Sequence, residues 1–390
     1  MQQRFCSIFS QLLQLFSRTE FQQAVRESKS EYHARGFTCW SQFVAMLFCQ
    51  LGRAHSLREI CGGLASIEGK LAHLGVQKPP KRSTLAYANE HRSYELYIHV
   101  FYQLLERCQA AAALHRRKFR FKNKLLSLDA TVISLCASMF DWAKFRRTKG
   151  AVKLHLVLDH DGYLPTFALI TQGREHEIHL AYNLEFEPGS ILVMDRAFCD
   201  FGFFAHLTER DVFFVTRRKV NVAYQIVESR PVPDGNNVLG DYVIELTSAQ
   251  GQKKCPHRLR LVTYFDPETM HRFEFLTNNF RLSARTIADI YKERWRIELF
   301  FKALKQNLKI KTFVGTSANA LLTQIWTALI AMLLLRFLQL KSKFAWSLSN
   351  LVALLRMNLF VYRDLWTWLD DPYTHPPQLP EAIQTALPFG

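Results

Sequence analysis

One stretch organises the rest of the chain: IADIYKERWRIELFFKALKQNLKIKTF, residues Ile287–Phe313. Its apolar residues recur at helical spacing, which predicts one helix with a buried stripe. On a helical wheel, polar side chains gather in a sector of about 60°, namely Tyr291, Arg294, Glu298 and Lys305, with Lys302 at its flank. A carboxylate among cations and a phenol suits a surface that meets a phosphodiester backbone and offers an oxygen ligand to a hard metal ion. The alternative is a solvated, charge-laced helix.

Composition indicates a globular protein with a polyanionic partner. The chain has 390 residues, enough for two or three domains, and 48% of them are hydrophobic. The 50 Lys and Arg outnumber the 34 Asp and Glu, which gives a net charge of +16. Such an excess favours nucleic acid, although a membrane surface would also attract it.

Several classes of protein are disfavoured. The eight cysteines form no CxxC pair, so we expect buried thiols in a reducing cytoplasm and neither a disulfide framework nor a zinc site. No signal peptide is visible, and the apolar run Ile325–Leu335 is too short to span a bilayer, so it is expected to be a core helix. No glycine-rich phosphate loop or nucleophile elbow is present, and we expect no small-molecule cofactor.

The order of patterns predicts a mixed α/β fold (α+β). Residues 1–115 are expected to be wholly helical, with a long helix at Thr84–Cys108; they form either a DNA-binding module of helix-turn-helix character or a plain bundle. A basic linker, His115–Lys124, leads into strands. We expect the core to begin over 116–199, to be interrupted by an antiparallel β insertion over 200–281, and to resume as helices over 282–370. A Pro-rich tail, 371–390, follows and is expected to be poorly ordered.

Two aspartates stand at the ends of apolar strands. Asp129 interrupts Leu125–Leu135, and Asp195 ends the run that begins at Ile191. An ionised carboxylate there is costly unless it is paired or binds a metal. If the two strands are neighbours, their carboxylates converge, and with Glu298 they would form an oxygen site for Mg²⁺ or Mn²⁺. The alternative for each aspartate is a turn or cap residue.

Other acidic and histidine residues are weaker candidates for a site. Asp159 and Asp161 lie in a turn, and Asp200 is expected at the surface. A second set suggests a metal cluster, but a polar loop explains it better: Glu175, His176, Glu177 and His179.

These residues match a known family. The spacing of Tyr291, Arg294, Glu298 and Lys305 resembles the signature of bacterial insertion-sequence transposases of the DDE class, in the group called IS-four: Tyr, two residues, Arg, three, Glu, six, Lys. LLSLDATVI around the first aspartate and ILVMDRAFCDF around the second are also similar to the family. The resemblance covers nearly the whole chain.

The resemblance implies an RNase H-like core with a β insertion, in which Asp129, Asp195 and Glu298 hold two Mg²⁺ ions, with Mn²⁺ as a substitute. It further implies phosphate contacts by a set of polar residues: Tyr291, Arg294, Lys305, Lys302 and Arg196. In members that cut through a hairpin, a flipped base stacks on an aromatic residue; Trp295, Phe273 and Phe275 are candidates here, with core packing as the alternative for each.

The implied function is that of a transposase that binds double-stranded DNA, both its terminal inverted repeats and its target, in the bacterial cytoplasm at the nucleoid. A homodimer is expected on DNA, and no membrane partner. Two alternatives remain open from the sequence: a catalytically silent, transposase-derived DNA-binding protein, and an RNase H-like nuclease that hydrolyses without joining.

Overall fold

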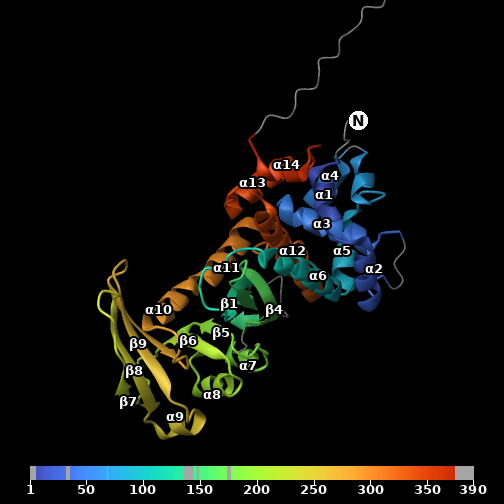
Figure 1. Ribbon diagram of the computed structural model, residues 1–390. Coiled ribbons are helices and arrows are strands. Elements are labelled where there is room, and N and C mark those ends of the chain that lie inside the picture. Colours follow the sequence, from blue (N-terminus) through green and yellow to red (C-terminus); the bar gives the residue numbers. More distant parts are fainter. Residues whose placement is uncertain are drawn as a thin grey trace, which may run out of the picture.

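The computed structural model describes residues 6–31, 36–67, 69–135, 144–146, 149–173 and 177–373. The helices are α1 (Ile8–Gln14), α2 (Arg18–Glu27), α3 (Cys39–Leu51), α4 (Leu57–Ala65), α5 (Arg82–His91), α6 (Glu95–Ala112), α7 (Glu177–Tyr182), α8 (Phe201–Glu209), α9 (Ala249–Lys254), α10 (Ala284–Glu293), α11 (Trp295–Asn307), α12 (Ala318–Lys341), α13 (Leu348–Asn358) and α14 (Leu365–Asp370), with 3-10 turns η1 (Lys70–Leu74) and η3 (Arg196–Phe198). The strands are β1 (Leu125–Leu135), β2 (Lys144–Arg146), β3 (Lys149–Asp159), β4 (Leu164–Gln172), β5 (Ile191–Met194), β6 (Phe213–Arg217), β7 (Tyr224–Ser229), β8 (Val238–Leu246), β9 (Leu259–Asp266) and β10 (His271–Thr277). Helices cluster at one end of the molecule and strands at the other (Figure 1).

The core of the strand-rich part of the molecule is a mixed sheet with β1 in its middle. β3 pairs antiparallel with β1 on one side and with β4 beyond it. On the other side β5 is parallel to β1, and β6 is parallel to β5. The apolar strand β5 is buried along its whole length, as expected for a strand covered on both faces. This arrangement of three antiparallel strands followed by two parallel ones is the RNase H-like core expected from the sequence.

The β insertion begins later than the sequence suggested. The segment 200–281 was expected to be an antiparallel insertion throughout, but α8 and β6 belong to the core, because α8 is the crossover that brings β6 parallel to β5. The antiparallel part is the run β7–β8–β9–β10, which continues the same sheet through the pairing of β10 with β6. Parallel pairing between β5 and β6 leaves no local sequence signal, which explains the misplaced boundary.

The N-terminal helices share a hydrophobic core with the C-terminal ones. One cluster of buried side chains includes residues of α3 and α6, of α12 and of α13, and it reaches β3 of the sheet. Its centre is α12, which is long and apolar enough to cross a membrane, although 83% of that apolar window is buried inside the molecule. The apolar run expected as a core helix is therefore the middle of α12, packed against α3, α5 and α6.

The long helix expected at Thr84–Cys108 is two helices, α5 and α6. Arg92 adopts an extended conformation (φ −84°, ψ 133°) between them. The side chain of Asn319 holds this break: its Nδ2 donates to the carbonyls of Asn89 (2.8 Å) and Arg92 (2.6 Å), and its Oδ1 accepts from the Tyr94 amide (3.3 Å). A residue more than 200 positions away thus satisfies the groups that the interruption exposes.

The helix expected at Ile287–Phe313 is also broken, at Arg294, and it ends at Asn307. The Arg294 amide donates to the Tyr291 carbonyl (3.0 Å), and the Ile297 amide donates to the Arg294 carbonyl (3.2 Å), so the break is a short 3-10 turn between α10 and α11. Side chains on either side fix it. Glu293 is buried and paired with Lys118 at 2.5 Å, whereas Arg294 turns toward the sheet.

Candidate active site

The two aspartates follow the last paired residues of two neighbouring strands. β1 and β5 are parallel and in register, with Leu128 opposite Met194 as their last pair. The next residues are Asp129 and Asp195, and neighbouring strands are about 4.8 Å apart. Asp195 directly follows the end of β5 as expected, whereas Asp129 lies in the middle of β1, because β1 continues to Leu135 alongside β3. The pairing expected from the sequence is therefore present.

Asp129 is held in a setting that disfavours its charge. Its side chain is 17% exposed, and burial raises its pKa to about 6, with Asp195 adding to the rise. The Ala130 amide, which donates to Oδ1 at 2.8 Å, and Arg294 both oppose this rise. Burial therefore makes the ionised form of Asp129 more costly than that of an exposed aspartate.

Arg294 joins the helix to the sheet at this point. Its guanidinium lies 3.5 Å from Asp129 Oδ2 and donates to Glu298 Oε1 at 2.5 Å. Nε and Nη1 of Arg294 are buried without a hydrogen-bond partner in the described part of the chain. The signature residues of the kinked helix are thus directed onto the middle of β1, with a cation between two carboxylates.

A shallow pocket beside Asp129 collects most of the remaining signature residues. Asp129 and Glu298 line it together with Lys302, Lys305 and Lys311. Lys305 donates to Thr131 Oγ1 (2.6 Å) and to the Val132 carbonyl (3.0 Å), which ties α11 to β1. Burial and the neighbouring charge of Lys311 lower the pKa of Lys305. Lys311, which lies beyond the end of α11, was not singled out from the sequence.

A second pocket, rich in aromatic groups, adjoins Arg294 on the side of the β insertion. Tyr291 and Trp295 line it together with Tyr264, Phe273 and Phe275. Trp295 is 57% exposed, so it does not pack in the core, whereas Phe275 is buried and stacks near Tyr291 at 4.8 Å between ring centroids.

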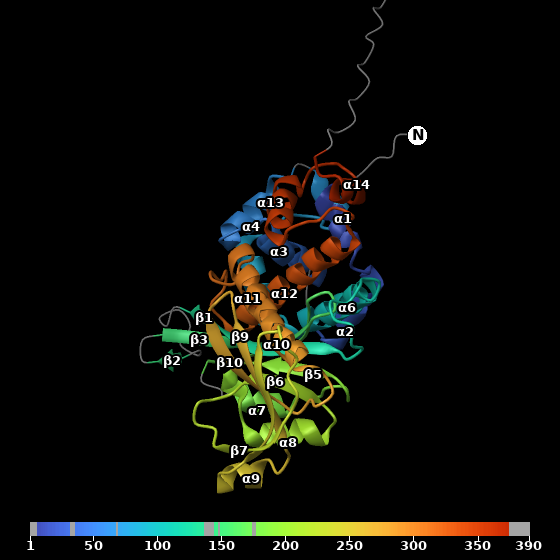
Figure 2. The same cartoon turned by 60° about the vertical axis from the view of Figure 1, so that its left-hand side comes forward.

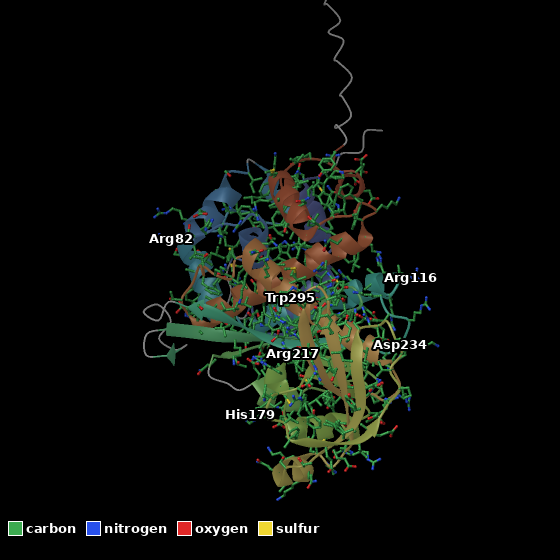
Figure 3. All side chains as sticks on the ribbon, turned by 90° about the vertical axis from the view of Figure 1, so that its left-hand side faces the viewer. Arg82, Arg116, His179, Arg217, Asp234 and Trp295 are labelled. Atoms are coloured by element: carbon green, nitrogen blue, oxygen red, sulfur yellow. The ribbon has the colours of Figure 1, made fainter. Side chains whose placement is uncertain are left out.

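Sequence reasoning missed Arg217, at the end of β6. Its guanidinium lies 4.9 Å from the centroid of the Phe273 ring, and its charge acts on Tyr291. Arg217 and Trp295 lie near each other on one face of the molecule (Figure 3). The signal that could have found it is the pair Arg217-Arg218, a doubled cation directly after an apolar strand.

Other candidates are not brought to this site. Arg196 is exposed in η3, directly after Asp195, and forms no hydrogen bond or ion pair with the carboxylates in the described part of the chain. Asp200 caps α8, accepting from the Phe203 amide at 2.9 Å, instead of being a free surface residue. Glu177 is the exception: it pairs with Lys153 at 3.2 Å, and its charge adds to the raised pKa of Asp129, so it lies near the site. Glu175 and His176 fall outside the described residues.

The donor set fits a divalent cation, although it is not assembled as a cage. Asp129 and Asp195 supply adjacent carboxylates, and burial together with the charge of Asp195 raises the pKa of Asp129, so a bound cation would stabilise its charged form. Within the described ranges, however, no three His, Cys, Asp or Glu side chains form a group that could hold a metal ion. The reason is visible in the contacts: Glu298 is bonded to Arg294, which stands between it and Asp129.

Comparisons with known proteins agree with this arrangement. Residues 120–334 match a family described as "Transposase DDE domain", and residues 6–77 match "Domain of unknown function (DUF4372)". The transposase y4zB of Sinorhizobium fredii is 32% identical over 79% of this chain and 85% of its own length. A transposase for insertion sequence element IS5377 of Geobacillus stearothermophilus is 29% identical over 66% of this chain and 67% of its own.

Two further proteins are more distant. A transposase for insertion sequence element IS4SA of Synechocystis is 25% identical over 66% of this chain and 71% of its own. The cryo-EM structure of the piggyBac transposase synaptic complex with hairpin DNA gives a TM-score of 0.47 at 10% identity, over 96% of this chain and 85% of that one. The family match spans more than half of the sequence and includes Asp129, Asp195 and Glu298, so the chain belongs to the DDE transposases.

Proposed function

We propose that this transposase binds the terminal inverted repeats of an insertion sequence, cleaves DNA there and joins the freed ends to target DNA. The observation that carries the proposal is the register of β1 and β5, which places Asp129 beside Asp195, with Arg294 and Glu298 above them. The net charge of +16 supports a DNA partner.

Membership of the family implies a divalent metal ion, and we propose that Asp129, Asp195 and Glu298 hold two Mg²⁺ ions, with Mn²⁺ as a substitute. When bound, such ions activate a water or a 3′-hydroxyl and stabilise the leaving oxygen of an in-line displacement at phosphorus. For Glu298 to join the aspartates, Arg294 has to release it, since the two are now bonded at 2.5 Å. A DNA phosphate is a suitable new partner for that guanidinium.

Other residues of the chain would position the DNA. Lys302 and Lys305 line the pocket beside Asp129 and are placed to contact phosphates. Tyr291 lines the aromatic pocket, and the charge of Arg217 acts on it. Arg196 is exposed next to Asp195 and could contact the same backbone.

Trp295 is the candidate for base stacking. Its half-exposed ring opens onto a pocket lined by Tyr264 and Phe273, where an unpaired base would find an apolar surface. Phe275 is a less suitable platform because it is buried. We propose that the active assembly on DNA is a homodimer, which would let each protomer act on one end, in the bacterial cytoplasm at the nucleoid.

The test is Glu298→Gln, which keeps the size of the side chain and removes its charge. Mg²⁺-dependent cleavage of a labelled element end is expected to be lost, while binding to the same DNA is retained. Glu209→Gln is the matched control, since Glu209 is exposed at the end of α8 and far from the carboxylates. Normal cleavage by the Glu298 variant would remove that residue from the site, and recovery of cut but never joined DNA from the unmodified protein would indicate a nuclease instead.

A further inference from the structure

A second group of cations lies at the far end of α11, where the helical part of the molecule meets the catalytic part. The group consists of Arg53, Lys309 and Arg356 and is called here the distal cation cluster. Arg53 follows α3, Lys309 follows α11, and Arg356 lies in α13. Figure 2 shows α11 running from the sheet toward α3, α4 and α13, so three distant segments meet there.

The three charges repel one another. Burial lowers the pKa of Lys309, and the charges of Arg53 and Arg356 lower it further. Burial and Arg53 likewise lower the pKa of Arg356. None of the three forms a salt bridge with a carboxylate in the described part of the chain; the Lys309 ammonium instead lies 2.6 Å from Nδ1 of His55. Glu59 attracts Lys309, but its own oxygens accept from the His55 amide (2.8 Å) and Ser56 Oγ (3.2 Å).

The backbone that carries Lys309 is held by buried polar groups. Gln50 is fully buried, and its Oε1 accepts from the Lys309 amide at 2.7 Å. Gln324, also fully buried, donates to the carbonyls of Lys309 (2.7 Å) and Thr312 (2.8 Å). Buried amides are costly unless they are bonded, so two core positions fix the segment that carries the buried Lys309 and the exposed Lys311.

The cluster continues the cationic line that starts at the carboxylates. Lys302, Lys305 and Lys311 line the pocket of Asp129 and Glu298, and Lys309 follows at the end of the same helix. α11 covers roughly 14 Å between Glu298 and its last residue at about 1.5 Å per residue. This is less than half of the roughly 34 Å turn of B-DNA, so one duplex can contact both ends of the line.

We propose that the distal cation cluster binds the phosphodiester backbone of the same DNA duplex whose phosphates lie at the catalytic carboxylates, with the exposed Arg53 and the half-buried Arg356 in contact and the buried Lys309 adding its charge behind them. This inference rests on the proposed function and locates the DNA contact of the N-terminal helices at the turn between α3 and α4. A protein surface that concentrates unneutralised cations gains free energy when it releases the counterions of a polyanion.

The experiment measures binding of the full chain to a fluorescein-labelled duplex of mixed sequence by anisotropy, over a series of salt concentrations. Each phosphate contact contributes a slope of about 0.9 in log K against log salt. Arg53→Ala is expected to reduce the magnitude of the slope by about that amount, and Arg53→Ala with Arg356→Gln by about twice as much. Lys253→Ala, on α9 at the far end of the β insertion, should leave the slope unchanged.

Lys309→Met supplies an independent readout. This substitution removes a charge that Arg53 and Arg356 repel, on a side chain that is only 6% exposed. The melting temperature should therefore be unchanged or higher, while DNA affinity falls. Slopes and affinities equal to those of the Lys253 control in all three variants would overturn the inference. If those variants bind normally while DNA is still cut, only this inference fails; if the unmodified protein binds DNA but never cuts it, the proposed function fails instead.

Discussion

Arg294 donates a 2.5 Å hydrogen bond to Glu298 and lies 3.5 Å from Asp129, so its guanidinium bridges two of the three carboxylates proposed to bind metal. The bond to Glu298 joins residues four apart across the first turn of α11, next to the 3-10 break. If these carboxylates bind metal ions, the metal ions and Arg294 compete for the same oxygens.

Arg294→Gln should therefore separate metal binding from catalysis. Removing a unit charge near the carboxylates is expected to tighten Mn²⁺ binding to the DNA-free protein by roughly tenfold, because the repulsion at close range is lost. Cleavage should fall by about 10²-fold or more if the same group contacts the reacting phosphate. Calorimetric titration with Mn²⁺ and a cleavage assay measure the two effects. A weaker affinity for Mn²⁺ in the variant would contradict the competition.

Trp295→Ala tests base stacking beside the site. The ring is 57% exposed, so its removal should change the melting temperature little. Loss of a base stack costs about 1–3 kcal/mol, which corresponds to roughly 5- to 150-fold in binding or cleavage of an element end. Trp295→Phe keeps a π-face and should recover most of the loss. Fluorescence of 2-aminopurine placed next to the cut reports the stack directly, and equal emission with both variants would speak against it.

Asp159 gives a pH-dependent prediction. Burial raises its pKa to about 6 from an ordinary value of 3.8, so the folded state holds the proton more tightly than the unfolded one. Between these two values stability falls as pH rises, and above pH 6 the full cost of the buried charge remains. At pH 8, Asp159→Asn should unfold at a higher temperature than the unmodified protein. The gain in unfolding free energy should be at most about 3 kcal/mol. The difference should vanish near pH 3.8; an equal gain at both pH values would refute the assignment.

The β insertion is anchored to the signature helix by one buried ion pair. Arg260 binds Asp241 through two hydrogen bonds of 2.8 and 2.7 Å, and its third nitrogen donates to the carbonyls of Asn279 and Leu282, just before α10. Both side chains are at most 4% exposed. Asp241→Ala leaves a buried charge unpaired and should cost about 3–5 kcal/mol of unfolding free energy. Urea unfolding measures it, with Glu268→Ala, at an exposed pair with Lys292, as the control that should change little.

Local patterns predicted the parts of the fold that depend on local chemistry. The apolar run around Asp129 and the run before Asp195 became β1 and β5, and their pairing followed from the family resemblance and from the cost of isolated carboxylates. Arg294 lies 3.5 Å from Asp129 in β1 and is bonded to Glu298, whereas the roles that their spacing suggested stay predictions.

What the sequence could not show depends on distant partners. Apolar periodicity continues through Arg294 without Gly or Pro, so nothing local marks the break that Lys118 and Glu293 stabilise. The division between α5 and α6 needs Asn319, and the place of β6 needs its parallel neighbour β5. The interruption in the signature helix is also what lets Arg294 occupy the space between the carboxylates.

The central claim is that Asp129, Asp195 and Glu298 bind metal ions that act in DNA cleavage, and a change of ligand tests it most directly. Asp195→Cys replaces a hard oxygen with a soft thiolate, which binds Mg²⁺ poorly and prefers softer ions. This variant is expected not to cut an element end with Mg²⁺ and to regain cleavage when Cd²⁺ or Zn²⁺ is added. Cleavage by the unmodified protein should not increase with either ion. Cleavage with Mg²⁺ alone at the unmodified rate would contradict it.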